Sequence, residues 1–259
     1  MVVQAAAGCL NNLSCEGGEV VEQLVEQDVI TPLATLLEQF RGLGSKLVEE
    51  KRVRTLVDSL GLLWNVMEQS QTAIDIFNRQ NMLEIVLQFL DTNRFPSSLV
   101  LVSLSLLATA CDNNIPAQHQ MSPHFDTLSD MVESEVVSHQ VKVTTGVLLL
   151  NMFKTQIYDS QVFPLLMSAV SGCLQLDSRK MVSGWSSSAP LDQDDGDMEV
   201  EGASDVIKED KVSDECKEVM KAQIAALEIV ANLACQDEDE DSLEEFRDDI
   251  DFDASDDVK

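Results

Sequence analysis

Residues 225–233 read AALEIVANL, a run of small and apolar residues that closes in Asn followed by an apolar residue. Earlier runs end in a similar way: AAAGCLNNL (5–13), SLGLLWNVM (59–67), SLSLLATAC (103–111), with Thr109 in the Asn place, and TTGVLLLNM (144–152). The aligned positions 12, 65, 109, 151 and 232 are separated by 53, 44, 42 and 81 residues. Periods in the forties are typical of two- or three-helix units that stack into a solenoid.

The rest of the chain predicts helices as well. Apolar residues recur at helical spacing outside two acidic stretches, and residues 82–90 are apolar on nearly all sides, as a helix between other helices would be. Sustained alternation of apolar and polar residues next to turn pairs, the pattern of hairpins, is absent from the sequence. Thr31 before Pro32 predicts a helix with Thr31 as its N-cap. We therefore expect an all-α solenoid.

The separation of 81 residues indicates an insertion of about 39 residues in a unit of about 42. Residues 177–215 are rich in Ser, Gly, Asp and Glu, so they are predicted to form a disordered acidic loop inside a repeat, between its second and third helices. The expected organisation is then armadillo-like repeats over 1–176, the loop over 177–215, the last helix over 216–236 and an acidic tail over 237–259. The first unit is incomplete and no polar capping repeat is evident, so we expect a piece or a truncated form of a longer solenoid.

Charge restricts the class of partner. The 259 residues include 46 Asp and Glu against 17 Lys and Arg, a net charge of −29. Direct binding to nucleic acid or to an anionic membrane is disfavoured, because both need clustered basic residues. We expect a basic partner, attracted by the acidic stretches; the alternative is that these stretches are solubilising spacers. The acidic candidates for cargo contact are Asp192, Asp194, Asp195, Asp197, Glu199, Glu201, Asp237, Glu238, Asp239, Glu240 and Asp241.

Catalytic and metal sites are not expected. His119, His124 and His139 are accompanied by no HExxH motif and no glycine-rich phosphate loop. A calcium loop read from Asp192 fails, because its sixth position is Asp197 instead of glycine and its twelfth is Ala203 instead of glutamate. The sequence therefore predicts a protein that is not an enzyme and that binds no cofactor and no metal.

The repeated asparagines are the candidate binding residues. In a solenoid of three-helix units the third helices line the concave face, so Asn12, Asn65, Asn151 and Asn232 would form a ladder there. An amide both donates and accepts hydrogen bonds, so it can clamp the backbone of an extended peptide. The alternative is that each Asn satisfies a local backbone carbonyl. Trp64, directly before Asn65, is either a groove residue or a core residue.

These run endings resemble the third helix of an armadillo repeat, which closes in L-x-N-L. Residues 24–40, LVEQDVITPLATLLEQF, resemble the short first helix, turn and second helix of that unit. A closer resemblance is to the symportin family, that of HEAT repeat-containing protein 3. It is carried by AAAGCLNNLSC (5–15), LLWNVMEQS (62–70) and an acidic loop before MKAQIAALEIVANLAC (220–235).

The symportin resemblance implies an armadillo/HEAT solenoid that escorts the basic large-subunit ribosomal proteins uL18 and uL5 into the nucleus, towards assembly with 5S ribosomal RNA. It implies a carrier that shuttles between cytoplasm and nucleus. Family members are read by a nuclear transport receptor at a basic cluster followed by Pro-Tyr, which does not occur here, so we expect that contact through parts outside this chain. The alternatives are a generic armadillo scaffold and an acidic histone-type chaperone.

A generic receptor for nuclear localisation signals is disfavoured. In importin-type receptors the groove Trp lies four residues before the Asn. Here the corresponding places hold Gly8, Gly61, Val147 and Glu228, so the paired Trp–Asn array is absent.

Overall fold

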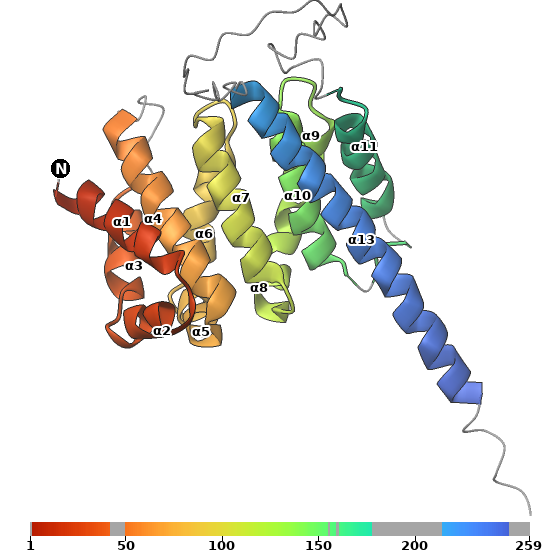
Figure 1. Cartoon of the computed structure of the whole chain (residues 1–259), viewed down its shortest axis with the longest axis horizontal. Helices are drawn as coiled ribbons and strands as arrows, with labels where there is room; N and C mark the ends of the chain where they lie inside the picture. The colour runs from red at the N-terminus through yellow and green to blue at the C-terminus, as the bar shows by residue number, and fades with distance from the viewer. Residues whose placement is uncertain (1, 42–49, 155, 159–160, 178–213, 249–259) are drawn as a thin grey trace, which may run out of the picture.

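The computed structural model describes residues 2–41, 50–154, 156–158, 161–177 and 214–248, with side chains between 216 and 235 in the last stretch. Every regular element within these residues is a helix, which confirms the all-α prediction (Figure 1). In chain order they are α1 (Val2–Ser14), α2 (Gly18–Glu26), α3 (Ile30–Glu38), α4 (Glu50–Gln69), α5 (Gln71–Arg79), α6 (Met82–Leu87), the 3-10 helix η1 (Gln88–Leu90), α7 (Ser97–Cys111), α8 (Ile115–Met121), the 3-10 helix η2 (Ser122–His124), α9 (Phe125–Glu133), α10 (His139–Met152), α11 (Val162–Leu174) and α13 (Asp214–Asp248).

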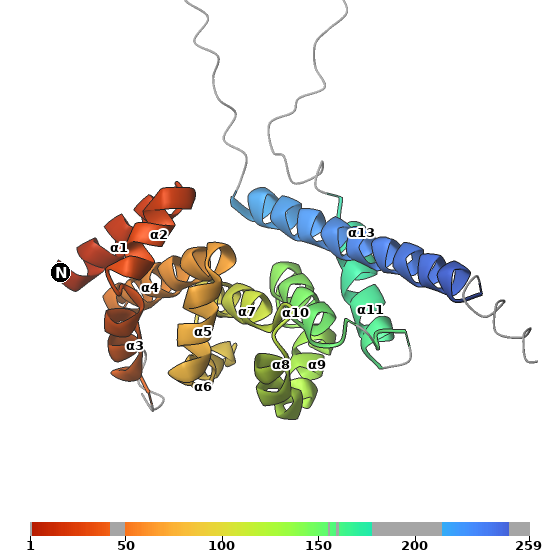
Figure 2. The same cartoon turned by 90° about the horizontal axis from the view of Figure 1, so that it is seen from below.

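The helices repeat in units of three, a short first helix, a second helix and a longer third helix. The third helices α1, α4, α7, α10 and α13 form one row, in which each contacts the next. Figure 2 shows this row as an arc, with α7 at its floor and α1 and α13 rising at its two ends. Figure 2 shows α3, α6, α8 and α9 on the convex side of the arc and α2 beside α1 at its end. The solenoid predicted from the period is confirmed.

A single apolar core runs through the row and joins the units. Leu60, Leu104 and Leu148, from three successive third helices, are fully buried in one cluster that extends from Val21 to Leu233. Burying one such side chain contributes about 1.5–3 kcal/mol, so the interfaces between repeats dominate the stability. An edge-to-face pair, Phe89 and Phe95, closes the core at 5.5 Å between ring centroids.

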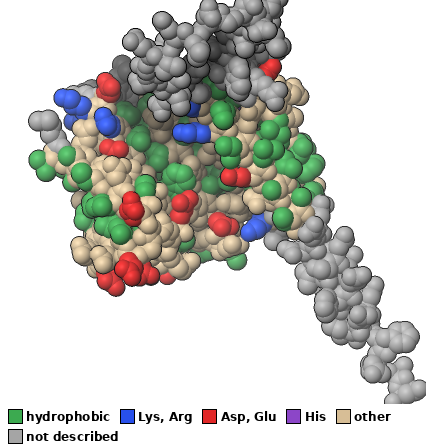
Figure 3. All heavy atoms as spheres, in the orientation of Figure 1, with side chains coloured by type: hydrophobic (Ala, Val, Ile, Leu, Met, Phe, Trp, Pro, Cys, Tyr) green, Lys and Arg blue, Asp and Glu red, His purple; other side chains and the backbone are tan. Residues whose placement is uncertain are grey.

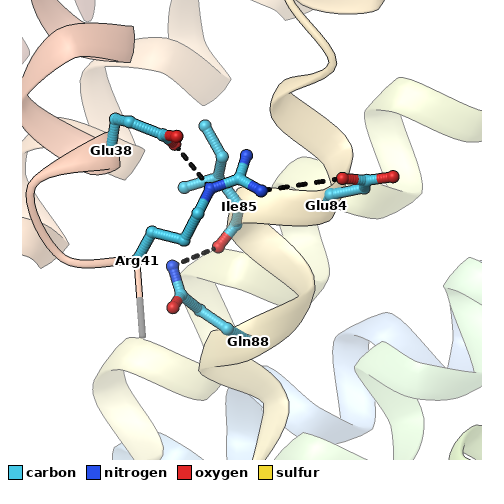
Figure 4. Close-up of polar contacts among 5 residues, drawn as sticks. All are labelled: Glu38, Arg41, Glu84, Ile85 and Gln88. Atoms are coloured by element: carbon cyan, nitrogen blue, oxygen red, sulfur yellow. Dashed lines mark hydrogen bonds and ion pairs between the residues drawn. The ribbon is translucent and has the colours of Figure 1, made fainter. Parts of the chain in front are cut away.

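Polar contacts between the second helices lie outside this core. Arg41, just after α3, places its Nε 2.8 Å from Glu38 Oε2 and its Nη1 3.7 Å from Glu84 Oε2 on α6 (Figure 4). Gln88, the first residue of η1, donates from its Nε2 to the carbonyl of Ile85 on α6 at 2.9 Å. These side chains are open to solvent, so the ion pairs fix orientation more than they stabilise.

The helix starts follow local capping chemistry. Ser70 Oγ accepts from the Ala73 N–H at 3.3 Å at the start of α5, and Ser138 Oγ accepts from the Val141 N–H at 3.4 Å at the start of α10. The start of α3 differs from the prediction, because Thr31 lies inside the helix. Asp28, in a left-handed conformation at φ 55°, accepts from the Thr31 N–H at 3.3 Å instead. An Asp tolerates that conformation, so the chain re-enters a helix before Pro32.

The last helix extends past its predicted end at 236 and continues to Asp248. Adding residues to an existing helix is much easier than starting one, and Glu is a good helix former, which favours this extension. The predicted disordered loop over 177–215 interrupts the last unit between α11 and α13. Apart from Asp177 and the first two residues of α13, it lies outside the described residues.

Candidate functional site

The concave side of the arc is the candidate binding surface. Its floor is formed by α4, α7 and α10, and its two walls by α1 and α13 (Figure 2). Figures 1 and 3 look onto this side, and Figure 3 shows acidic, basic and hydrophobic side chains interspersed on it. The surface is long enough to meet a partner along five successive third helices.

Asn65 is half-buried and joins α4 to the end of α1. Its Nδ2 donates to Asn11 Oδ1 at 3.1 Å and to Ser14 Oγ at 2.9 Å. The two helices approach closely because Gly61 has no side chain. A Cβ placed there would lie only 3.0 Å from Asn11 Oδ1.

Asn151 lies half-buried in the corresponding place on α10. Its Nδ2 donates to the Ala108 carbonyl of α7 at 2.9 Å, and its own carbonyl accepts from Gln118 Nε2 at 3.0 Å. Both central asparagines thus bond to the preceding third helix, and not to a carbonyl of their own helix as the local-carbonyl alternative describes. A side-chain amide carries two N–H donors and one acceptor oxygen, so these bonds engage only part of each amide.

The two outer asparagines differ from the central pair. Asn12 and Asn232 are exposed, at the first and last helices of the row. The contact with Asn65 is made by Asn11, one residue before the predicted position. The four predicted residues therefore do not form one contacting cluster; they are spread along the floor and walls. Sequence reasoning missed Asn11, although the Asn11–Asn12 doublet contains it.

Trp64 links the floor of the groove across two repeats. Its Nε1 donates to Thr109 Oγ1 on α7 at 3.0 Å, so the residue that replaces Asn in the third unit accepts this bond. The indole is half-buried and packs on the core, as the core alternative describes, while its role in a groove stays a prediction. Glu68 follows one turn later; partial burial raises the pKa of its carboxyl, and a hydrogen bond from Trp64 opposes that rise.

Charged groups border the floor at its α10 end. Lys154 Nζ lies 3.7 Å from Asp112 Oδ1. The predicted acidic contacts Asp192, Asp194, Asp195, Asp197, Glu199 and Glu201 lie outside the described residues. Asp237, Glu238, Asp239, Glu240 and Asp241 belong to α13 by their backbone, and their side chains lie outside the described part.

One histidine and three of the cysteines, Cys111, Cys173 and Cys216, have buried atoms or side chains. His139 Nδ1 is buried without a hydrogen-bond partner, and burial, with Lys142 nearby, lowers the pKa of the ring. Burial raises the pKa of the Cys111 thiol to about 12, which keeps it unreactive at neutral pH. In the described part of the chain, no group of three or more His, Cys, Asp or Glu side chains is arranged to hold a metal ion.

No helix in the described part of the chain has the length and apolarity to cross a membrane.

Comparison with known proteins gives two relatives of the same kind. The chain is 30% identical to HEAT repeat-containing protein 3 of Homo sapiens over 299 aligned positions, which cover 95% of this chain and 43% of that protein. It is 42% identical to HEAT repeat-containing protein 3 of Mus musculus over 125 residues, 44% of this chain and 18% of that protein. The chain thus spans less than half the length of these relatives. No protein-family profile matches it. No solved structure matches it either.

Proposed function

Because the chain belongs to the family of HEAT repeat-containing protein 3, we propose that it is a protein-binding carrier for basic large-subunit ribosomal proteins, uL18 and uL5. It escorts them between cytoplasm and nucleus for ribosome assembly, and works by binding alone, without catalysis or a cofactor. The observation that carries the proposal is the net charge of −29 on a chain whose third helices form a concave row.

The groove supplies the specific part of this binding. An extended cargo segment crossing α4, α7 and α10 meets the remaining amide atoms of Asn65 and Asn151, which bond main-chain groups of any sequence. Half-exposed Trp64 offers an indole face to a Lys or Arg side chain. A cargo side chain that stacks there lies one turn from the Glu68 carboxylate.

The acidic residues supply the long-range part. Basic ribosomal proteins are held away from other polyanions when their Lys and Arg side chains face an acidic surface, and opposite charges speed the first encounter. This contribution is screened over a Debye length of about 8 Å at physiological salt, so binding weakens as salt rises.

The test is a set of binding curves with purified proteins. The chain is titrated with uL18 and with uL5 at about 150 mM salt, where long-range ionic attraction is largely screened, and core histones serve as equally basic controls. We expect at least tenfold tighter binding of one ribosomal protein than of histones. Equal affinities would reduce the function to non-specific polyanion binding and contradict the proposal.

Two variants separate the groove from the acidic loop. Asn151→Ala removes one groove amide, and Asn93→Ala, an exposed Asn in the turn between η1 and α7, is its control. Deletion of residues 178–213 removes the loop. We expect Asn151→Ala to weaken cargo binding severalfold while Asn93→Ala leaves it unchanged, and the loop deletion to flatten the dependence on salt. A groove contribution is excluded if the two Asn variants bind alike.

A further inference from the structure

Helix α13 carries a stripe of exposed apolar side chains. On α13 Met220, Ile224, Leu227 and Val230 are 41–56% exposed, at the spacing that places them along one side of a helix. Met167 and Leu174 of the neighbouring α11 are also exposed. Figure 3 shows hydrophobic side chains gathered at the end of the molecule where these two helices lie. Contiguous exposed apolar surface of this kind marks an interaction site.

Comparison with the equivalent helix of the preceding repeat indicates that the stripe on α13 can be covered by another helix. Aligning Asn151 with Asn232 places Val143, Gly146 and Leu150 of α10 at Ile224, Leu227 and Ala231 of α13. All three positions are buried in α10, which lies between α7 and α13 in the row. A Cβ added at Gly146 would lie 3.2 Å from Ile229 Cδ1 of α13. The stripe on α13 therefore corresponds to a surface that, one repeat earlier, is covered by the next helix.

The stripe is complementary to itself when two copies run in opposite directions. Its first half carries the large residues Met220, Ile224 and Leu227, and its second half carries the small, exposed Ala231 and Ala234. An antiparallel pair centred on residue 229 sets Leu227 of each copy against Ala231 of the other. It also sets Ile224 against Ala234, so that large side chains fill the space above small ones.

Charge favours the same direction of pairing. The exposed Lys221 stands in the first half of the helix, and the acidic run of the sequence begins at Asp237 in the second half. In the antiparallel register centred on 229, position 221 of one copy lies level with position 237 of the other. A parallel pair would instead align the two acidic halves, where like charges repel.

We propose that α13 is a self-association surface through which two copies of this chain pair antiparallel, Leu227 against Ala231. The stripe from 220 to 234 is roughly 21 Å long at ~1.5 Å per residue, which suits a small, reversible interface. This pairing is independent of the floor of the groove, since it involves α13 and none of α4, α7 and α10.

Sedimentation velocity of the full chain over a range of protein concentrations tests the proposal. We expect a monomer–dimer equilibrium that Leu227→Glu weakens at least tenfold. Ile115→Glu, at an equally exposed apolar residue on α8, is the matched control and leaves the dimer unchanged. A chain that is monomeric at every concentration, or a dimer that both variants weaken equally, overturns the proposal. So does growth into larger oligomers that Val3→Glu on α1 prevents, because that result identifies a head-to-tail contact.

Disulfide trapping tests the register. In a background with the exposed Cys9, Cys15 and Cys235 replaced by Ser, one sample carries Leu227→Cys and another carries Ala231→Cys. Mixing them under mild oxidation is expected to give mainly the mixed disulfide. Predominant 231–231 disulfide, or no disulfide above an Ile115→Cys control, contradicts the antiparallel pairing.

Discussion

The third helices in the middle of the row and the one at its end carry the same sequence pattern in different surroundings. In α7 and α10 nearly every apolar side chain is buried, because a helix lies on each side. In α13 three residues equivalent to buried positions of α10, Ile224, Leu227 and Ala231, are exposed. The comparison teaches that a repeat's pattern specifies which side of a helix can be covered, while a neighbouring repeat decides whether it is covered.

The largest expected effect comes from truncating one leucine in each region. Leu104→Ala in α7 empties a fully buried site and should destabilise the chain by about 2–5 kcal/mol. Leu227→Ala in α13 should change the stability by at most about 0.5 kcal/mol, because the side chain is already exposed. Urea unfolding at a concentration where the chain is monomeric measures both. Similar losses would mean that the stripe on α13 is covered within the monomer.

A smaller loss of stability is expected when the residues at equivalent positions of α10 and α13, Gly146 and Leu227, are each replaced by the other. Gly146→Leu forces a large side chain against Ile229 and Leu166, and overpacking of this kind costs about 1–3 kcal/mol. The reverse change, Leu227→Gly, should cost about 1 kcal/mol, because glycine is a poor helix former. Thermal unfolding by circular dichroism compares the two. A neutral Gly146→Leu would show that α10 and α13 separate easily.

The same difference between the middle and the end of the row is expected for the asparagines, with smaller changes in stability. Asn151→Ala removes the bond to the Ala108 carbonyl and should cost about 1 kcal/mol. Asn232→Ala, at an exposed position, should cost close to nothing. Chemical unfolding measures both, with Asn93→Ala as a surface control. A greater loss of stability for Asn232→Ala than for Asn151→Ala would contradict the exposure of Asn232.

The smallest effect is on the pH dependence of stability. The pKa of His139 is lowered in the folded chain, so between pH 6.5 and that lower value the unfolded chain binds more protons and stability falls as pH falls. His139→Gln should reduce this loss between pH 7.5 and 5.5, as measured by urea midpoints. His119→Gln is the control. A profile unaltered by His139→Gln would contradict the burial of the ring.

Local pattern was enough to predict the helices and the three-helix period, because apolar spacing and turn residues act within a few positions. The candidate site stays a prediction. Asn65 and Asn151 are half-buried and bond to the preceding third helix, and it is Asn11, not Asn12, that contacts Asn65. Successive residues point about 100° apart on a helix, so a shift of one position in aligning degenerate repeats changes which side chain faces the groove.

The sequence by itself determined that this chain is an all-α solenoid with an acidic excess, since period and charge are properties of the residues alone. Only the tertiary structure decided which equivalent residues are buried. Ile224 and Leu227 belong to a stripe on α13 that a neighbouring helix could cover, and in the structure both are exposed. Burial depends on the presence of a neighbouring surface, and a pattern within one helix contains no information about whether that neighbour is there.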